Sequence, residues 1–273
     1  HDMFDTAPDG SVPGRVNERG WLAAGVPGTL GGMQLAIELF GTKSTGDLLA
    51  PAISLARGGV PLSEGTVRAI RGSLEFLRRD AGSARLLLID GEPPSPGAVF
   101  RNPDLATMLE SLAEAGTLDG FYRGEIGRVI AEAFQANGGI VTFDDMAAYH
   151  AHEVDPLVFE WMGQRVYTAP LTAGGATIVE ALSILRALDS SGGSLRSPRA
   201  RLESLRIAWK DRLDLFGDPE HSDVPLARLL SPEYAQGMAG RVATAMGRGR
   251  ALRMEALSRE QDGTIHLSAA DDE

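Results

Sequence analysis

The residues best placed to do chemistry lie near the C-terminal end of the chain, in the segment from Asp262 to Ser268 (DGTIHLS). A polar stretch there runs into an alternating apolar pattern, which predicts the start of a strand. If the bond before Thr264 were cut, the freed α-amine, with an ordinary pKa of about 7.7–8, could act as the base for the threonine hydroxyl. Gly263 would let the backbone reach the strained geometry of an N-to-O acyl shift. An ordinary strand start explains the same residues without any chemistry.

Two glycine-rich turns precede predicted helices. The run from Gly25 to Gly32 and the pair Gly174-Gly175 could turn backbone N–H groups toward an anion, as phosphate-binding loops do. Neither turn contains the dinucleotide-binding fingerprint or a Gly-Lys-Ser/Thr ending. We therefore interpret both turns as places of close backbone packing.

Two histidines have a spacing that could suit a metal ion. His150 and His152 flank Ala151, so in a strand both rings would face one side. The spacing places no carboxylate or third histidine to complete the site. We interpret both as exposed loop residues, and we expect no metal and no cofactor.

The composition excludes several classes of protein. With 26 Lys and Arg against 37 Asp and Glu, the net charge is −11, which disfavours nucleic acid or an anionic membrane surface as a partner. The absence of cysteine excludes disulfides, thiolate zinc sites and a cysteine nucleophile. The uncharged stretch from Gly20 to Ile37 contains five glycines and Pro27, so we expect no membrane segment.

The elements that must position these residues are predicted to be mostly helices. Helix starts are indicated at Ser63, at Asn102-Pro103 and at Thr142, where Asp145 would complete a capping box. Apolar spacing and glycine stops predict helices over residues 33–40, 46–56, 63–77, 103–115, 119–137, 143–149, 175–188 and 202–216, and from 232 onward. The predicted buried face of the 119–137 helix is Phe121, Ile126, Val129, Ile130 and Phe134, and that of the 202–216 helix is Leu202, Leu205, Trp209, Leu213 and Phe216. Residues 154–169 instead predict a β-hairpin that turns at Met162-Gly163.

A series of segments along nearly the whole chain resembles the γ-glutamyltransferase (γ-glutamyltranspeptidase) family of N-terminal-nucleophile hydrolases. Each segment is weak alone, but together, in the family's order, they are specific. They are Ala23–Thr29 (AAGVPGT), Leu49–Ala56 (LAPAISLA), Phe121–Gly124 (FYRG), Gly138–Thr142 (GGIVT), Asp145–Tyr149 (DMAAY) and Ala169–Gly175 (APLTAGG).

The resemblance implies an α+β fold, the αββα sandwich of these hydrolases, with this chain supplying mostly helical layers and a few strands. It matches Thr264 to the first threonine of the family's TTH motif and His266 to its histidine, whereas Ile265 departs from the second threonine. In the family, self-cleavage makes this threonine the N-terminus of the small subunit. The threonine then attacks a γ-glutamyl amide such as that of glutathione, and the acyl group passes to water or to an amino-acid or peptide acceptor.

The resemblance also implies a division of the chain within one fold. Residues 1–263 would be a portion of the large subunit and residues 264–273 the start of the small subunit, with Gly174 and Gly175 supporting the wall of the site. Family precursors carry further substrate-binding residues at both ends, so we expect the 273 residues alone to be inactive and to expose apolar helix faces. The resemblance suggests a periplasmic or extracellular location, with any export signal upstream of His1.

Two alternatives stay open. A cephalosporin acylase-like amidase uses the same nucleophile with a different acyl pocket, whose residues would lie outside this chain. A non-catalytic helical binding module, in which Thr264 is a plain strand residue, is consistent with the departure at Ile265.

Overall fold

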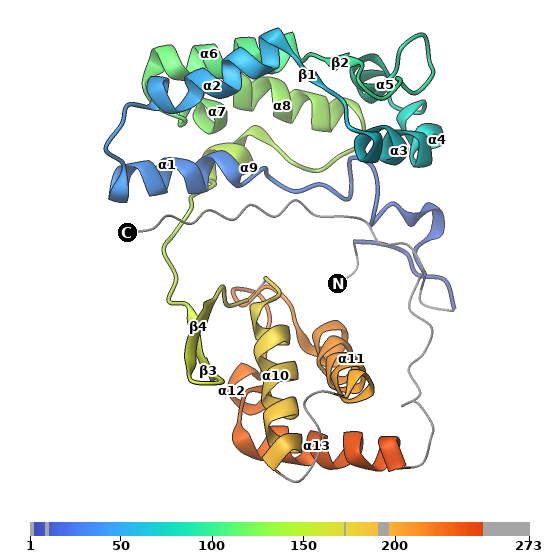
Figure 1. The fold of residues 1–273 in the computed structure, drawn as a ribbon. Helices are drawn as coiled ribbons and strands as arrows, with labels where there is room; N and C mark the ends of the chain where they lie inside the picture. The colour runs from blue at the N-terminus through green and yellow to red at the C-terminus, as the bar shows by residue number, and fades with distance from the viewer. Residues whose placement is uncertain (1–2, 9–10, 172, 191–196, 248–273) are drawn as a thin grey trace. The chain divides into compact units, whose positions relative to one another are not determined.

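The computed structural model describes residues 3–8, 11–171, 173–190 and 197–247. The chain divides into two compact units, residues 1–152 and residues 153–273 (Figure 1). Helices make up most of both units, and the strands of the described ranges form two separate two-stranded antiparallel sheets. No helix in these ranges is both long enough and apolar enough to span a bilayer.

The first unit is almost entirely helical. Its elements are η1 (Pro13–Arg15), α1 (Thr29–Phe40), α2 (Thr45–Gly58), β1 (Val60–Pro61), α3 (Glu64–Gly72), α4 (Leu74–Leu77), α5 (Ala81–Leu87), β2 (Val99–Phe100), α6 (Pro103–Ala115), α7 (Gly120–Arg123), α8 (Glu125–Ala136) and α9 (Phe143–Ala148). Helix α2 lies along α6, and α7, α8 and α9 pack against one another (Figure 1). The core between them consists of Leu112, Leu118, Phe121, Tyr122, Ala131, Phe134, Val141 and Met146.

The helix starts predicted from local signals are confirmed. The Ser63 side chain accepts a hydrogen bond from the Thr66 N–H, and Asn102 accepts one from the Leu105 N–H at 3.0 Å. Thr142 and Asp145 each bond the other's backbone N–H, which completes the capping box. These contacts form within one turn, so residue type and spacing alone predict them.

Two helices predicted as continuous are broken. The 119–137 helix divides into α7 and α8 at Gly124, whose backbone is extended (φ −100°, ψ −163°). Val129, predicted to be buried, is 54% exposed. The 63–77 helix divides at Ser73 into α3 and α4. At Gly124 the bend lets both α7 and α8 contribute residues to the core, whereas α4, after the break at Ser73, buries no residue.

The second unit contains the predicted hairpin and four helices among its described residues. They are β3 (Leu157–Trp161), β4 (Gln164–Thr168), α10 (Gly175–Ser190), α11 (Pro198–Leu215), α12 (Leu226–Leu229) and α13 (Pro232–Gly247). Trp161 pairs with Gln164 around the turn. Met162 and Gly163 have φ values of 51° and 80°, the positive pair that a two-residue hairpin turn of type I′ requires. The predicted hairpin is therefore confirmed.

Helix α10 packs against α11 and α13 (Figure 1). The face that the sequence predicted α11 to bury is not the face that it buries. The residues that α11 buries are small or polar for the most part: Ala200, Glu203, Ser204, Ile207 and Ala208. Leu202, Leu205, Trp209 and Leu213 remain 42% to 55% exposed. Small residues four apart let α10 and α11 approach closely, so the larger apolar side chains occupy the other side of the helix.

Candidate functional site

The structure describes only part of the predicted site. Gly263, Thr264 and His266 lie within residues 248–273, outside the described residues. Gly174 and Gly175 are described, at the junction between the β3–β4 hairpin and α10.

The two glycines of this junction differ sharply in their surroundings. Gly175 is buried, and a Cβ placed on it would lie 2.1 Å from the Ala169 carbonyl oxygen and 2.5 Å from Thr168 Oγ1. Gly174 is exposed, and a Cβ there would meet nothing within 4 Å. The end of β4 therefore touches the first turn of α10 at Gly175, a contact that only glycine permits.

The junction is also tied to α11. The Arg212 guanidinium donates to the Ala173 carbonyl oxygen at 3.1 Å, and the Ile178 N–H bonds the Gly174 carbonyl oxygen at 3.1 Å. The hairpin, α10 and α11 thus hold one short segment in place. These contacts suit a supporting role for Gly174-Gly175 better than direct recognition of an anion.

The first glycine run packs against two tyrosines, as its interpretation as close packing predicts. The Tyr122 hydroxyl accepts a hydrogen bond from the Gly31 N–H at 2.8 Å and donates one to the Pro27 carbonyl oxygen at 2.7 Å. A Cβ on Gly28 would lie 2.4 Å from the Tyr149 hydroxyl oxygen. Burial raises the pKa of Tyr122, so its hydroxyl keeps the proton that it donates. The role of Tyr122 was not predicted, and its place in the FYRG segment was the only signal for it.

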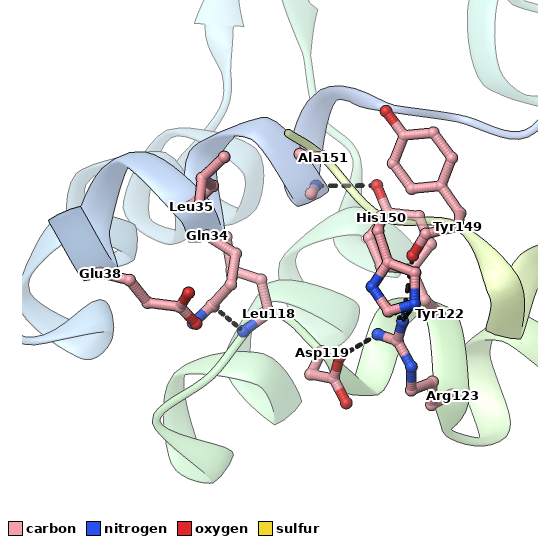
Figure 2. A pocket seen from close by; sticks show the side chains of 11 residues that line it. Gln34, Leu35, Glu38, Leu118, Asp119, Tyr122, Arg123, Tyr149, His150 and Ala151 are labelled. Carbon is pink, nitrogen blue, oxygen red and sulfur yellow. Dashed lines mark hydrogen bonds and ion pairs between the residues drawn. The ribbon is translucent and has the colours of Figure 1, made fainter. Parts of the chain in front are cut away.

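A small pocket opens beside this contact (Figure 2). Its volume is about 140 Å³, and its lining residues are Gly31, Gln34, Leu35, Glu38, Leu118, Asp119, Tyr122, Arg123, Tyr149, His150 and Ala151. Gln34 Oε1 accepts from the Leu118 N–H at 2.8 Å, which joins α1 to the start of α7. None of the lining residues is serine, threonine or cysteine, so the pocket supplies no aliphatic hydroxyl or thiol nucleophile.

Arg123 organises the charges of the pocket. Its guanidinium pairs with Asp119, donates to the Tyr149 carbonyl oxygen at 3.0 Å and lies 3.1 Å from His150 Nδ1 (Figure 2). A cation beside the His150 ring is an unfavourable setting for a metal ligand. His150 is exposed, as predicted, and the described ranges contain no group of three or more His, Cys, Asp or Glu residues that could hold a metal ion.

Replacing Tyr122 by phenylalanine should destabilise the protein. The variant leaves the partly buried Gly31 N–H and the Pro27 carbonyl oxygen without their partner, the hydroxyl of the buried Tyr122. We expect a loss of about 1–3 kcal/mol in the free energy of unfolding, the cost of an unsatisfied buried polar group. Urea denaturation followed by circular dichroism measures it.

Tyr149 provides the matched control for this prediction. Its ring stacks on Tyr122 with centroids 5.2 Å apart, but its hydroxyl has no hydrogen bond among the described residues. Tyr149→Phe should therefore cost much less than Tyr122→Phe. Equal losses in the two variants would show that the hydroxyl of Tyr122 is not what holds the glycine turn.

A solved structure with a similar fold defines the class of the chain. It is similar to the crystal structure of Helicobacter pylori gamma-glutamyltranspeptidase, with a TM-score of 0.79 and 28% identity over 89% of this chain and 70% of that one. The expected fold class is thereby confirmed: this is an α+β chain with the fold of the N-terminal-nucleophile hydrolases.

The chain belongs to the gamma-glutamyltranspeptidase family, whose model matches residues 1–273. It is 36% identical over 232 residues to the glutathione hydrolase proenzyme of Pseudomonas sp. strain A14, covering 83% of this chain and 40% of the relative. It is 31% identical over 261 residues to the acylase ACY 1 proenzyme of Pseudomonas sp. strain SE83, covering 94% of this chain and 46% of that relative. The chain thus spans less than half the length of these curated relatives.

Proposed function

We propose that the protein containing this chain is a self-processing enzyme that transfers or hydrolyses γ-glutamyl groups, with Thr264 as its nucleophile. The observation that carries the proposal is the family match across residues 1–273, because that range includes Gly263-Thr264. The names of the relatives as proenzymes support a maturation step.

In the proposed processing step, Thr264 Oγ attacks the Gly263 carbonyl carbon. The peptide C–N bond breaks as an ester C–O bond forms, and the proton of the hydroxyl ends on the released α-amine. Water then hydrolyses the ester. This releases residues up to Gly263 as a large subunit and leaves Thr264 as the N-terminus of a small subunit, of which residues 264–273 are the start.

In the proposed catalytic cycle, the free α-amine of Thr264 takes the proton of its own hydroxyl as Oγ attacks the γ-carbonyl carbon of a γ-glutamyl amide such as glutathione. The amide bond breaks, the leaving amine takes up that proton, and the γ-glutamyl group remains as an ester on Thr264. Water or an amino-acid or peptide acceptor then removes the acyl group. No step requires a cofactor. His266, Gly174 and Gly175 are assigned supporting roles around the nucleophile.

The processing step can be tested by expressing the complete reading frame. A denaturing gel should show two chains, and N-terminal sequencing of the smaller one should begin at Thr264. A single uncut chain, or a new N-terminus at another residue, would contradict the assignment of Thr264 as the nucleophile. Either result would favour a non-catalytic helical module. We expect residues 1–273 expressed alone to show no turnover, since the chain spans 40% of the Pseudomonas sp. A14 relative.

A cephalosporin acylase-like activity is the second candidate, favoured by the similarity to the acylase ACY 1 proenzyme. Both activities use the same nucleophile and differ in the acyl group that the enzyme accepts. Comparing the turnover of a γ-glutamyl anilide with that of a β-lactam amide by the processed enzyme separates them. Preference for the β-lactam amide would overturn the γ-glutamyl assignment while keeping Thr264 as the nucleophile.

A further inference from the structure

Helix α10 carries a carboxyl group in the interior of the second unit. Glu180 is 0% exposed, and as an ionised group it finds no hydrogen-bond donor for either carboxylate oxygen among the described residues. Burying a carboxylate without a partner is costly, so such a group normally gains a cation or a proton. Nothing in the proposed function uses Glu180.

A second carboxyl group faces Glu180 from α11. Asp211 lies within hydrogen-bonding reach of Glu180, and the Tyr234 hydroxyl of α13 donates to Asp211 Oδ2. Two carboxylates have only acceptors, so Glu180 and Asp211 can bond each other only if one of them carries a proton. Tyr234 already donates to Asp211, which therefore suits the ionised form and leaves the proton on Glu180.

Charged groups from neighbouring elements also lie around this cluster. On α12, Arg228 lies 5.7 Å from the centroid of the Tyr234 ring. From β3, the Glu160 carbonyl oxygen accepts from Arg186 of α10, and the Glu160 side chain is exposed. Glu203 of α11 is also buried and has an interaction of its own.

Two hydroxyl groups on the same two helices are also without partners. Thr177 Oγ1, one turn before Glu180 on α10, and Ser204 Oγ on α11 are buried without a hydrogen bond in the described part of the chain. Helices α10 and α11 therefore bury several polar groups that have no hydrogen bond among the described residues.

We propose that Glu180 and Asp211 share one proton in the folded second unit, and that loss of this proton at alkaline pH weakens the packing of α10 against α11 and α13. The Glu180 O–H and the Tyr234 O–H then donate to one Asp211 carboxylate, so that two hydrogen bonds to this carboxylate join three helices. Because α10 begins at Gly175, this cluster lies on the same helix as the glycine junction.

The direction of the pH dependence follows from the proton balance. Burial, together with the Asp211 carboxyl, raises the pKa of Glu180 from 4.5 to about 8. Between these two values the folded chain keeps a proton that the unfolded chain releases, so stability falls as the pH rises. The stability that the protonated Glu180 contributes to the folded state is fully present below about pH 4.5 and is lost by about pH 8. In that range the equilibrium constant for unfolding should rise by up to about tenfold per pH unit from this group.

Glu180→Gln in the complete protein tests the proposal, because the amide keeps a donor toward Asp211 but cannot ionise. Urea denaturation between pH 5 and 9 should show that the variant lacks this proton-linked loss and exceeds the wild type in stability at pH 9. Asp189→Asn, which changes an exposed carboxylate of the same helix, should keep the wild-type profile. A wild-type pH profile in Glu180→Gln, or an equal loss of stability at every pH, would overturn the proposal.

Two further measurements keep the test decisive. Difference infrared spectra at pH 7 should contain the C=O stretch of a protonated carboxyl group that Glu180→Gln removes, and absence of this band would contradict the shared proton. If added Ca²⁺ or Mg²⁺ stabilised the wild type at pH 9 but not the variant, the cluster would be a buried cation site instead. Neither readout depends on catalytic turnover, so failure of the proposed activity would leave this test intact.

Discussion

Thr264→Ala in the complete protein should abolish both self-cleavage and γ-glutamyl turnover. The variant removes the hydroxyl that attacks the Gly263 carbonyl carbon in maturation and the substrate carbonyl in catalysis. A single uncut chain is expected on a denaturing gel. Turnover of a γ-glutamyl anilide should fall on the order of 10⁴-fold or more, the size of loss typical when a nucleophile is deleted.

Thr264→Ser is the matched control for this change. Serine keeps a hydroxyl on Cβ and, after cleavage, an adjacent α-amine, so the variant should still be cut at the same bond and retain measurable turnover. Turnover retained by Thr264→Ala would exclude the proposed mechanism. Loss of cleavage in both variants together with loss of the folded circular-dichroism spectrum would instead assign Thr264 a structural role.

Gly175→Ala should give the largest stability loss of any single methyl addition at the hairpin–helix junction. The new Cβ would lie 2.1 Å from the Ala169 carbonyl oxygen, which is backbone and cannot rotate away. The end of β4 or the start of α10 must move, at a cost of about 1–3 kcal/mol or more in the free energy of unfolding. Urea denaturation measures the loss, and hydrogen exchange should show faster exchange in β4 and the first turn of α10.

Gly174→Ala provides a control one residue away. A Cβ at Gly174 meets nothing within 4 Å, so this variant should unfold within about 0.5 kcal/mol of the wild type. If Gly174-Gly175 supports the catalytic wall as proposed, Gly175→Ala should also lower turnover in the processed enzyme. Equal stability of the two variants would contradict the close packing at Gly175.

Sequence signals within a few residues predicted local structure well. The helix starts at Ser63, Asn102 and Thr142 depend on a side chain and an N–H group three residues away, so their geometry is complete within one turn. The hairpin turn at Met162-Gly163 is equally local. The short pairing of β1 with β2 was not predicted, because two-residue strands carry no detectable period.

Predictions that required a choice between helix faces were less successful. The apolar residues of α11 have helical spacing, but the face buried against its neighbours contains Ala200, Ser204 and Ala208. Periodicity identifies an apolar face, whereas burial depends on how closely the neighbouring helices approach. The break at Gly124 also depends on tertiary packing. Helices α7 and α8 both contribute residues to the core only because the chain bends at Gly124.

The sequence by itself determined the family, through short segments in a specific order, and with it the proposed nucleophile Thr264. The family is identified by the types and order of the residues in those segments, which can be read without the three-dimensional structure. Only the tertiary structure decided that Gly175 is packed while Gly174 is open, that Tyr122 holds the first glycine turn, and that Glu180, Asp211 and Tyr234 meet. These contacts join residues of different elements, and long-range packing brings them together in a way that no local pattern encodes.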